Sequence, residues 1–128
     1  MNAQFDRALG ALAGVAMGDA MGMASQTFSR QEILAAYGRI TDFIDPIPDH
    51  PVSHGLTAAQ ITDDTEQTLL LAKLLLDNPD GFDEHQWAHS LLNWEADVRA
   101  RGLRDLLGPS SKEALNALLA GTPASETG

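Results

Sequence analysis

Residues 61–77 read ITDDTEQTLLLAKLLLD, and this stretch decides the fold class. Its six leucines recur at helical spacing over a wide face, which is typical of a helix packed at the centre of a domain. The pattern predicts a helix that begins at Thr62 or Asp63 and ends near Asp77. The following Asn78-Pro79-Asp80-Gly81 run ends it, because proline and glycine interrupt helical hydrogen bonding.

Helical patterns flank this segment on both sides. Ser29 with Glu32, and Asp83 with Gln86, are typical of capping boxes at helix starts. No segment shows the alternation of a half-buried strand. The predicted class is therefore all-α, in a single domain over 1–128, with further helices over about 4–18, 29–38, 83–102 and 110–121.

The first helical segment carries glycine at every fourth position, at Gly10, Gly14, Gly18 and Gly22. Residues four apart share one helix face, so this face has almost no side chains. Glycine destabilises a helix interior by about 1 kcal/mol per position. The pattern predicts that another backbone packs closely against this face. Asp19 interrupts the apolar run, which argues against a membrane span or a secretory signal.

Composition excludes several classes of function. The chain of 128 residues has 18 acidic and 8 basic residues and a formal net charge of −10. It has no basic cluster to meet nucleic acid or an anionic membrane, so neither is an expected partner. The absence of cysteine excludes disulfides, thiolate zinc sites and a cysteine nucleophile. We expect a cytoplasmic location, which fits this composition.

Residues 40–60 predict a long loop with prolines at Pro46, Pro48 and Pro51. Loops of this length inside a domain are usually functional or disordered. The loop also carries His50 and His54. On the fourth helical segment, His85 and His89 indicate an exposed face, whereas Trp87 and Trp94 share one stripe and predict core positions.

The residues that bear chemistry come directly after this loop. Thr62, Asp63 and Asp64 present hydroxyl and carboxylate oxygens, the ligands that hard divalent cations prefer. A second interpretation stays open: Asp63 with Glu66 is also typical of a capping box, and acids in a first turn are favoured by the helix dipole.

A second acid lies in an unusual setting, because Asp19 stands between Gly18 and Gly22 at the end of an apolar helix. Together the two segments resemble the ADP-ribosylglycohydrolase family. That family opens with a Gly/Ala-rich helix ending in Gly-Asp-x-x-Gly, and later shows Thr-Asp-Asp-Thr at the head of a Leu/Ala-rich helix. Residues 18–22 match the first motif and residues 62–65 match the second.

The resemblance implies a compact orthogonal multi-helix bundle, of which this chain corresponds to the N-terminal portion. It implies a dinuclear Mg²⁺ or Mn²⁺ centre that serves hydrolysis of the N- or O-glycosidic bond of ADP-ribose, on a protein side chain or a related small molecule. By position, Thr62, Asp63 and Asp64 would be metal ligands, and Asp63 and Gln26 would contact substrate. The resemblance leaves the catalytic residue unassigned.

Two features of the family pattern differ here. The chain contains neither the late Asp-x-Asp-Ser/Thr segment that supplies further ligands nor the Gly-Asn-Gly substrate loop. Gln26 stands where many members carry a glutamate that helps position or activate water. The alternative function is therefore a non-catalytic helical binding or scaffold protein that retains half of the metal site. In either case we expect association with a missing C-terminal portion or with a second copy.

Overall fold

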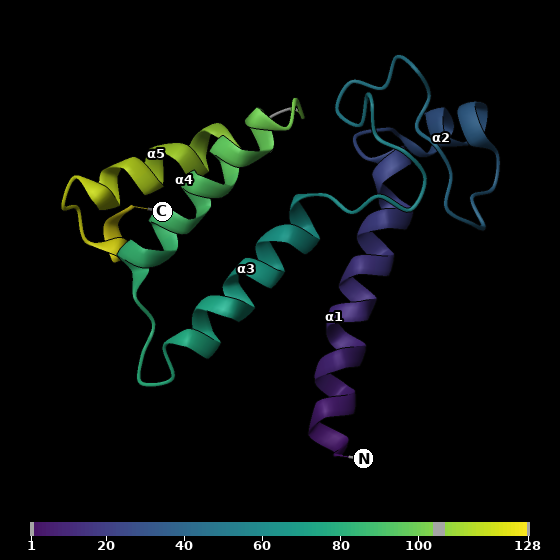
Figure 1. Cartoon of the computed structure of the whole chain (residues 1–128). Helices are drawn as coiled ribbons and strands as arrows, with labels where there is room; N and C mark the ends of the chain where they lie inside the picture. The colour runs from purple at the N-terminus through teal and green to yellow at the C-terminus, as the bar shows by residue number, and fades with distance from the viewer. Residues whose placement is uncertain (1, 104–106, 128) are drawn as a thin grey trace. The chain divides into compact units, whose positions relative to one another are not determined.

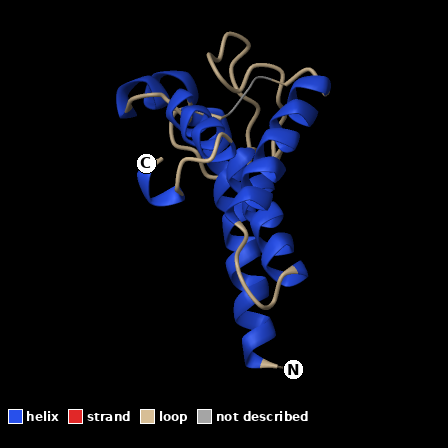
Figure 2. Ribbon diagram, turned by 90° about the vertical axis from the view of Figure 1, so that its left-hand side faces the viewer, coloured by secondary structure: helices blue, strands red, loops and turns tan. Residues whose placement is uncertain are grey.

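The computed structural model describes residues 2–103 and 107–127, and within these ranges it contains helices and no strand (Figure 2). The predicted all-α class is confirmed. In these described ranges, two short 3-10 helices accompany five α-helices. The elements, of which Figure 1 labels the α-helices, are α1 (Ala3–Gly22), η1 (Met23–Ser25), α2 (Arg30–Tyr37), α3 (Asp63–Asp77), α4 (Glu84–Ala100), α5 (Pro109–Leu119) and η2 (Ala124–Glu126).

Helix boundaries follow the sequence signals closely in the middle of the chain. Helix α3 spans the predicted residues. Helix α2 begins after Ser29, whose hydroxyl accepts from the Glu32 N–H while the Glu32 carboxylate accepts from the Ser29 N–H. Gly38 ends α2 with φ +66°, a conformation that favours glycine.

Helix α1 is longer than predicted. It continues through Gly22 rather than ending at Gly18, so Asp19 lies within its last turn. The Asp19 carbonyl accepts from the Met23 N–H, which keeps the helical hydrogen bonding intact past the glycines. Alanine and methionine between the glycines favour helix, and this explains why two isolated glycines do not end it.

The starts of α4 and α5 also differ from the prediction in detail. Asp83 accepts from the His85 and Gln86 N–H groups, but the Gln86 side chain accepts from Asn78 instead of returning to Asp83. The capping box is therefore one-sided. Helix α5 begins at Pro109 rather than Ser110, because proline fits the first helical turn.

The chain divides into two compact units, Met1–Leu69 and Leu70–Gly128. The division does not test the expectation of a single domain, which stays a prediction. In the second unit, α4 and α5 share an apolar core of Ala88, Leu91, Leu107, Leu115 and Leu118. Trp87 and Trp94 pack against it, so their predicted core role is confirmed.

Polar contacts complete the α4–α5 pair. Glu95 is buried at 8% exposure, and its carboxylate lies 2.6 Å from the Lys112 ammonium of α5 and 3.3 Å from the Arg99 guanidinium of α4. Two cations thus compensate the desolvated charge. His85 and His89 are exposed on α4, as predicted.

In the first unit, the proline-rich loop is held by side-chain hydrogen bonds. The Tyr37 hydroxyl accepts from the Ile47 N–H at 2.9 Å, and the Asp45 carboxylate accepts from the Ala58 N–H at 2.7 Å. These bonds satisfy backbone donors that have no partner in a helix or sheet. The loop therefore has a defined path back to α3.

The predicted packing against the glycine face of α1 is not found within the first unit. No described atom of this unit outside the helix's own backbone lies within 4 Å of where a Cβ would stand at Gly10, Gly14, Gly18 or Gly22. Apolar side chains of α1 are also exposed, with Phe5 at 63% exposure.

Residues 3–25 are long and apolar enough to cross a membrane by length and composition, with a mean hydropathy of 1.2. Core helices of soluble proteins and signal sequences share these properties, so the observation by itself is weak evidence for a membrane span. The expectation that the protein has no membrane partner stays a prediction.

Candidate functional site

Asp19 is the centre of the site in the first unit. Its carboxylate is buried at 9% exposure and accepts four hydrogen bonds. The Thr62 N–H and hydroxyl donate to it at 2.8 and 2.5 Å, and the Thr65 N–H and hydroxyl donate at 3.1 and 2.5 Å. One carboxylate of α1 therefore holds the beginning of α3.

This contact also caps α3. The Thr62 carbonyl accepts from the Glu66 N–H, so the helical hydrogen bonding of α3 starts at Thr62. The Thr65 N–H, which has no partner within the helix, donates to Asp19 instead. Asp63 is the first residue of α3. The carboxylate that caps this N–H is thus Asp19, from a distant segment, and not Asp63.

The hydrogen bonds determine the charge state of Asp19. Burial on its own would raise the pKa of this carboxyl, but the hydroxyl and N–H bonds from Thr62 and Thr65 outweigh it and hold the pKa below its ordinary value. Asp19 is therefore ionised at neutral pH. The positive end of the α3 dipole favours the same charge.

Asp19 also orients the Thr62 hydroxyl. A hydroxyl has one proton and two lone pairs. Because the Thr62 proton is donated to Asp19, the lone pairs of its Oγ1 are left to accept from, or coordinate, another group. Outer hydrogen bonds of this kind orient ligand side chains in metal sites.

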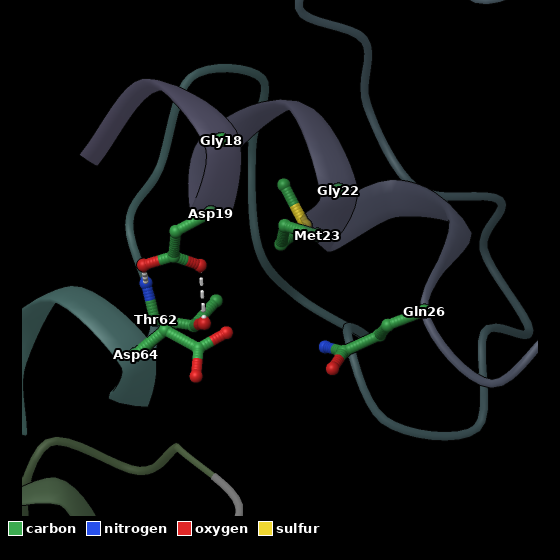
Figure 3. A pocket seen from close by; sticks show the side chains of 7 residues that line it. All are labelled: Gly18, Asp19, Gly22, Met23, Gln26, Thr62 and Asp64. Carbon is green, nitrogen blue, oxygen red and sulfur yellow. Dashed lines mark hydrogen bonds between the residues drawn. The ribbon is translucent and has the colours of Figure 1, made fainter. Parts of the chain in front are cut away.

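A pocket of about 330 Å³ opens beside this contact. In Figure 3 the Asp64 carboxylate lies next to Thr62, and Gln26 lies across the pocket from them. Glycines on α1 contribute no side chain, and the space a Cβ would take at each of them is open. The lining residues are Gly18, Asp19, Gly22, Met23, Gln26, Thr62 and Asp64.

The adjacent acids of α3 lie in different surroundings. Asp64 is exposed and lines the pocket, whereas Asp63 is half-buried and does not line it. Burial, and then the neighbouring charge of Asp64, raise the pKa of the Asp63 carboxyl above its ordinary value. The structure thus brings the predicted residues Thr62, Asp64 and Gln26 to one pocket; the predicted roles of Asp63 stay predictions.

Gln26 is held by a residue of the proline-rich loop. Its side-chain NH₂ donates to the Ser53 hydroxyl at 2.8 Å, and that hydroxyl donates to the Met23 carbonyl at 2.6 Å. Ser53 is completely buried. It therefore links the loop to the end of α1 at the pocket wall.

His50 supports Ser53 from within the same loop. Its Nδ1 accepts from the Ser53 N–H at 2.8 Å and from the Val52 N–H at 3.2 Å, and its ring lies 4.6 Å from that of Phe28. Because Nδ1 accepts, the neutral ring carries its proton on Nε2, which is buried and has no hydrogen-bond partner among the described residues. Burial lowers the pKa of His50; the nearby Gln26 carbonyl opposes this in part.

The donor set suits a hard cation only in part. Thr62, Asp63 and Asp64 offer one hydroxyl and two carboxylates, and every donor is oxygen, as Mg²⁺ and Mn²⁺ prefer. Across residues 2–103 and 107–127, no three His, Asp or Glu side chains group as a metal site would require. The described residues therefore do not form a complete metal site, and the metal-ligand roles of Thr62, Asp63 and Asp64 stay predictions.

Sequence reasoning placed Thr62, Asp64 and Gln26 at the site but missed Ser53 and Thr65 as its supports. Ser53 lies in a loop without regular periodicity, and nothing local distinguishes it from other loop serines. Thr65 carried a signal, because a hydroxyl in the first turn of a helix can face a residue that caps the helix.

Comparison with known proteins gives consistent matches. Residues 1–128 match the family model described as ADP-ribosylglycohydrolase. The chain is 37% identical over 121 residues to the uncharacterized protein YegU of Escherichia coli K12. The matched stretch covers 94% of this chain and 36% of YegU. An uncharacterized protein of Archaeoglobus fulgidus is 36% identical over 109 residues, a stretch that covers 84% of this chain and 32% of that protein. The chain thus spans about a third of the length of these curated relatives, and no solved structure matches it.

Proposed function

We propose that this chain, which belongs to the ADP-ribosylglycohydrolase family, contributes the first part of the active site of a metal-dependent glycosidic hydrolase. The bond broken would be the N- or O-glycosidic bond of ADP-ribose attached to a protein side chain or to a related small molecule. The observation that carries this proposal is the Asp19–Thr62 contact, which sets Thr62 and Asp64 beside one pocket with open space over two glycines.

The proposed metal is Mg²⁺ or Mn²⁺, with Thr62 and Asp64 at the pocket and the neighbouring Asp63 as its ligands. Burial, and then the neighbouring charge of Asp64, raise the pKa of the Asp63 carboxyl, and a bound cation would favour the ionised form of both carboxylates. Such a metal, once bound, supplies Lewis-acid polarisation and a template for the ribose hydroxyls and water.

The protein groups have separate tasks in this proposal. Asp19 keeps the Thr62 hydroxyl turned so that its lone pairs are available. Gly18 and Gly22 leave room for a ligand against α1. Gln26 presents an amide that orients a hydroxyl or a water from the opposite side. The catalytic residue stays unassigned within the described part of the chain.

The proposed substrates are ADP-ribosylated proteins or ADP-ribose-like small molecules in the cytoplasm. The net charge of −10 supports the absence of a nucleic-acid partner, since nucleic acid would be repelled.

The first test is calorimetric titration of the chain with Mn²⁺, and separately with Mg²⁺. Binding in the parent should be lost in Asp64→Asn and in the double variant Asp63→Ala/Asp64→Ala. Asp6→Asn, an exposed acid on α1, is the matched control and should bind as the parent does. Equal binding in all four chains would show that the acidic surface binds cations elsewhere, and would overturn the assignment.

A second test uses the glycines of α1 to block the pocket. Gly22→Leu places a side chain in the open space of the pocket without positive-φ strain, so it should abolish binding of ADP-ribose in the presence of Mn²⁺. Gly10→Leu makes the same substitution on the same helix outside the pocket lining and should leave binding unchanged. Equal loss in both variants would argue against this pocket.

The alternative is a non-catalytic binding or scaffold protein that retains half of the metal site. The amide at Gln26 favours it, because an amide cannot act as a general base. Release of ADP-ribose from an ADP-ribosylated protein, abolished by Asp64→Asn, would support the hydrolase. Metal-dependent ADP-ribose binding without any release would favour the alternative.

A further inference from the structure

The Ser53 hydroxyl determines which kind of side chain suits position 26. It lies 2.6 Å from the Met23 carbonyl, and a carbonyl can only accept, so the single hydroxyl proton points to Met23. The Ser53 oxygen therefore has only lone pairs to offer the Gln26 side chain, whose nitrogen lies 2.8 Å away. The side chain at position 26 must then donate a hydrogen bond to Ser53. An amide has an N–H that can do this, and an ionised carboxylate has no hydrogen to donate.

Ser53 itself has little freedom to change this arrangement. It is completely buried, and its N–H donates to His50 Nδ1. Turning the hydroxyl away from Met23 would give up the 2.6 Å hydrogen bond that this completely buried hydroxyl donates to the Met23 carbonyl. The direction of the Ser53–Gln26 hydrogen bond is therefore set from the Met23 side.

We propose that Ser53 is a positioning residue that fixes the Gln26 amide in the pocket, so that this position orients a hydroxyl or water of the ligand by hydrogen bonding and does not remove its proton. The ligand side of the proposal rests on the proposed function. With one N–H held by Ser53, the Gln26 side chain keeps its carbonyl oxygen and its second N–H for a ligand in the pocket that it lines.

Gln26→Glu tests the direction of the hydrogen bond. Only a protonated carboxyl can donate to Ser53 while Ser53 keeps Met23, so NMR titration should show the pKa of the introduced glutamate raised by about 1 unit or more. In Gln26→Glu/Ser53→Ala this pKa should fall back, although Asp64 is still nearby. Gln31→Glu, at an exposed position on α2, is the control and should titrate ordinarily.

A glutamate at 26 with an ordinary or lowered pKa, or one that Ser53→Ala leaves unchanged, would overturn the proposal, since Ser53 would then adapt to either side chain. This measurement needs no bound ligand. It also needs only the single Gln26→Glu variant if Ser53→Ala fails to fold.

ADP-ribose binding in the presence of Mn²⁺ tests the ligand side. Ser53→Ala and Gln26→Ala should each weaken binding about tenfold, as expected for loss of one oriented hydrogen bond. The double variant should be no weaker than Gln26→Ala, because Ser53 acts through Gln26. Additive losses would contradict a positioning role. If the parent binds no ADP-ribose, the proposed function fails, and the titration of Gln26→Glu still decides the role of Ser53.

Discussion

Asp19 joins two segments that lie 43 residues apart in the sequence. A buried carboxylate with four donors is stable only as long as every donor is present, because an unpaired buried charge is costly. Three of these donors act on one oxygen, Oδ2, and the fourth on Oδ1. The start of α3 therefore depends on the chemistry of one side chain of α1.

Asp19→Asn tests this dependence. An amide NH₂ replaces one of the accepting oxygens and would face a donor, so the free energy of unfolding should fall by about 2–4 kcal/mol. Chemical denaturation followed by circular dichroism measures the change. Asp6→Asn, at an exposed position near the start of the same helix, should change stability by less than about 0.5 kcal/mol. Equal stability of the two variants would contradict the capping role of Asp19.

Because the pKa of His50 is lowered in the folded protein, we expect the stability of the fold to depend on pH. The folded pKa of His50 is lowered by burial, so the unfolded chain takes up a proton first as the pH falls. The stabilisation that neutral His50 provides is full above the unfolded pKa of about 6.5 and is lost as the pH falls through the lower folded pKa. Protonation would also put a hydrogen on Nδ1, where the Ser53 N–H now donates.

Thermal unfolding between about pH 7.5 and pH 5 checks this prediction, across the range where histidine titrates. The decrease in Tm should be smaller in His50→Asn, whose side-chain oxygen can still accept from the Ser53 N–H. His54→Asn, at an exposed loop position, should follow the parent. Parallel pH profiles in all three chains would contradict a role for His50.

Among the helices, α4 depends on its own N-cap. Asp83 accepts from two first-turn N–H groups, and the expected return contact from Gln86 is absent because that side chain accepts from Asn78. Asp83→Ala should therefore lower the free energy of unfolding by about 1 kcal/mol. Urea denaturation measures it, with the preceding turn residue Asp80→Ala as control. A change of the same size at Asp80 would show that general charge, and not capping, is responsible.

For the molecule as a whole, the exposed apolar surface of α1 predicts association. Phe5, Leu9 and Met17 are each more than half exposed, and isolated soluble chains seldom leave such surface uncovered. Sedimentation should give a mass above the 13.7 kDa of one chain, rising with concentration.

Leu9→Lys should shift the sedimentation toward the monomer. Leu34→Lys is the control, at a comparably exposed leucine on α2, and should not. A parent that stays monomeric at every concentration would contradict the expectation of association.

The amino-acid sequence by itself determined the helices and most of their ends. Leucine spacing predicted a helix from Thr62 or Asp63 to near Asp77, which α3 matches, and Ser29 with Glu32 predicted the start of α2. These features depend on neighbours within about four positions along the chain, which sequence displays directly. The family resemblance that rests on the two short motifs predicted roles for Thr62, Asp63, Asp64 and Gln26, and the structure places three of these four at one pocket.

Only the tertiary structure decided how those residues are held. Thr62 is bonded to Asp19 across 43 positions, and Gln26 to Ser53 across 27. Such pairs form because the proline-rich loop returns the chain to the end of α1, and no local pattern encodes that path. The direction of each hydrogen bond then follows from which buried groups can only accept, and this is why the site combines an ionised Asp19 with an oriented amide at Gln26.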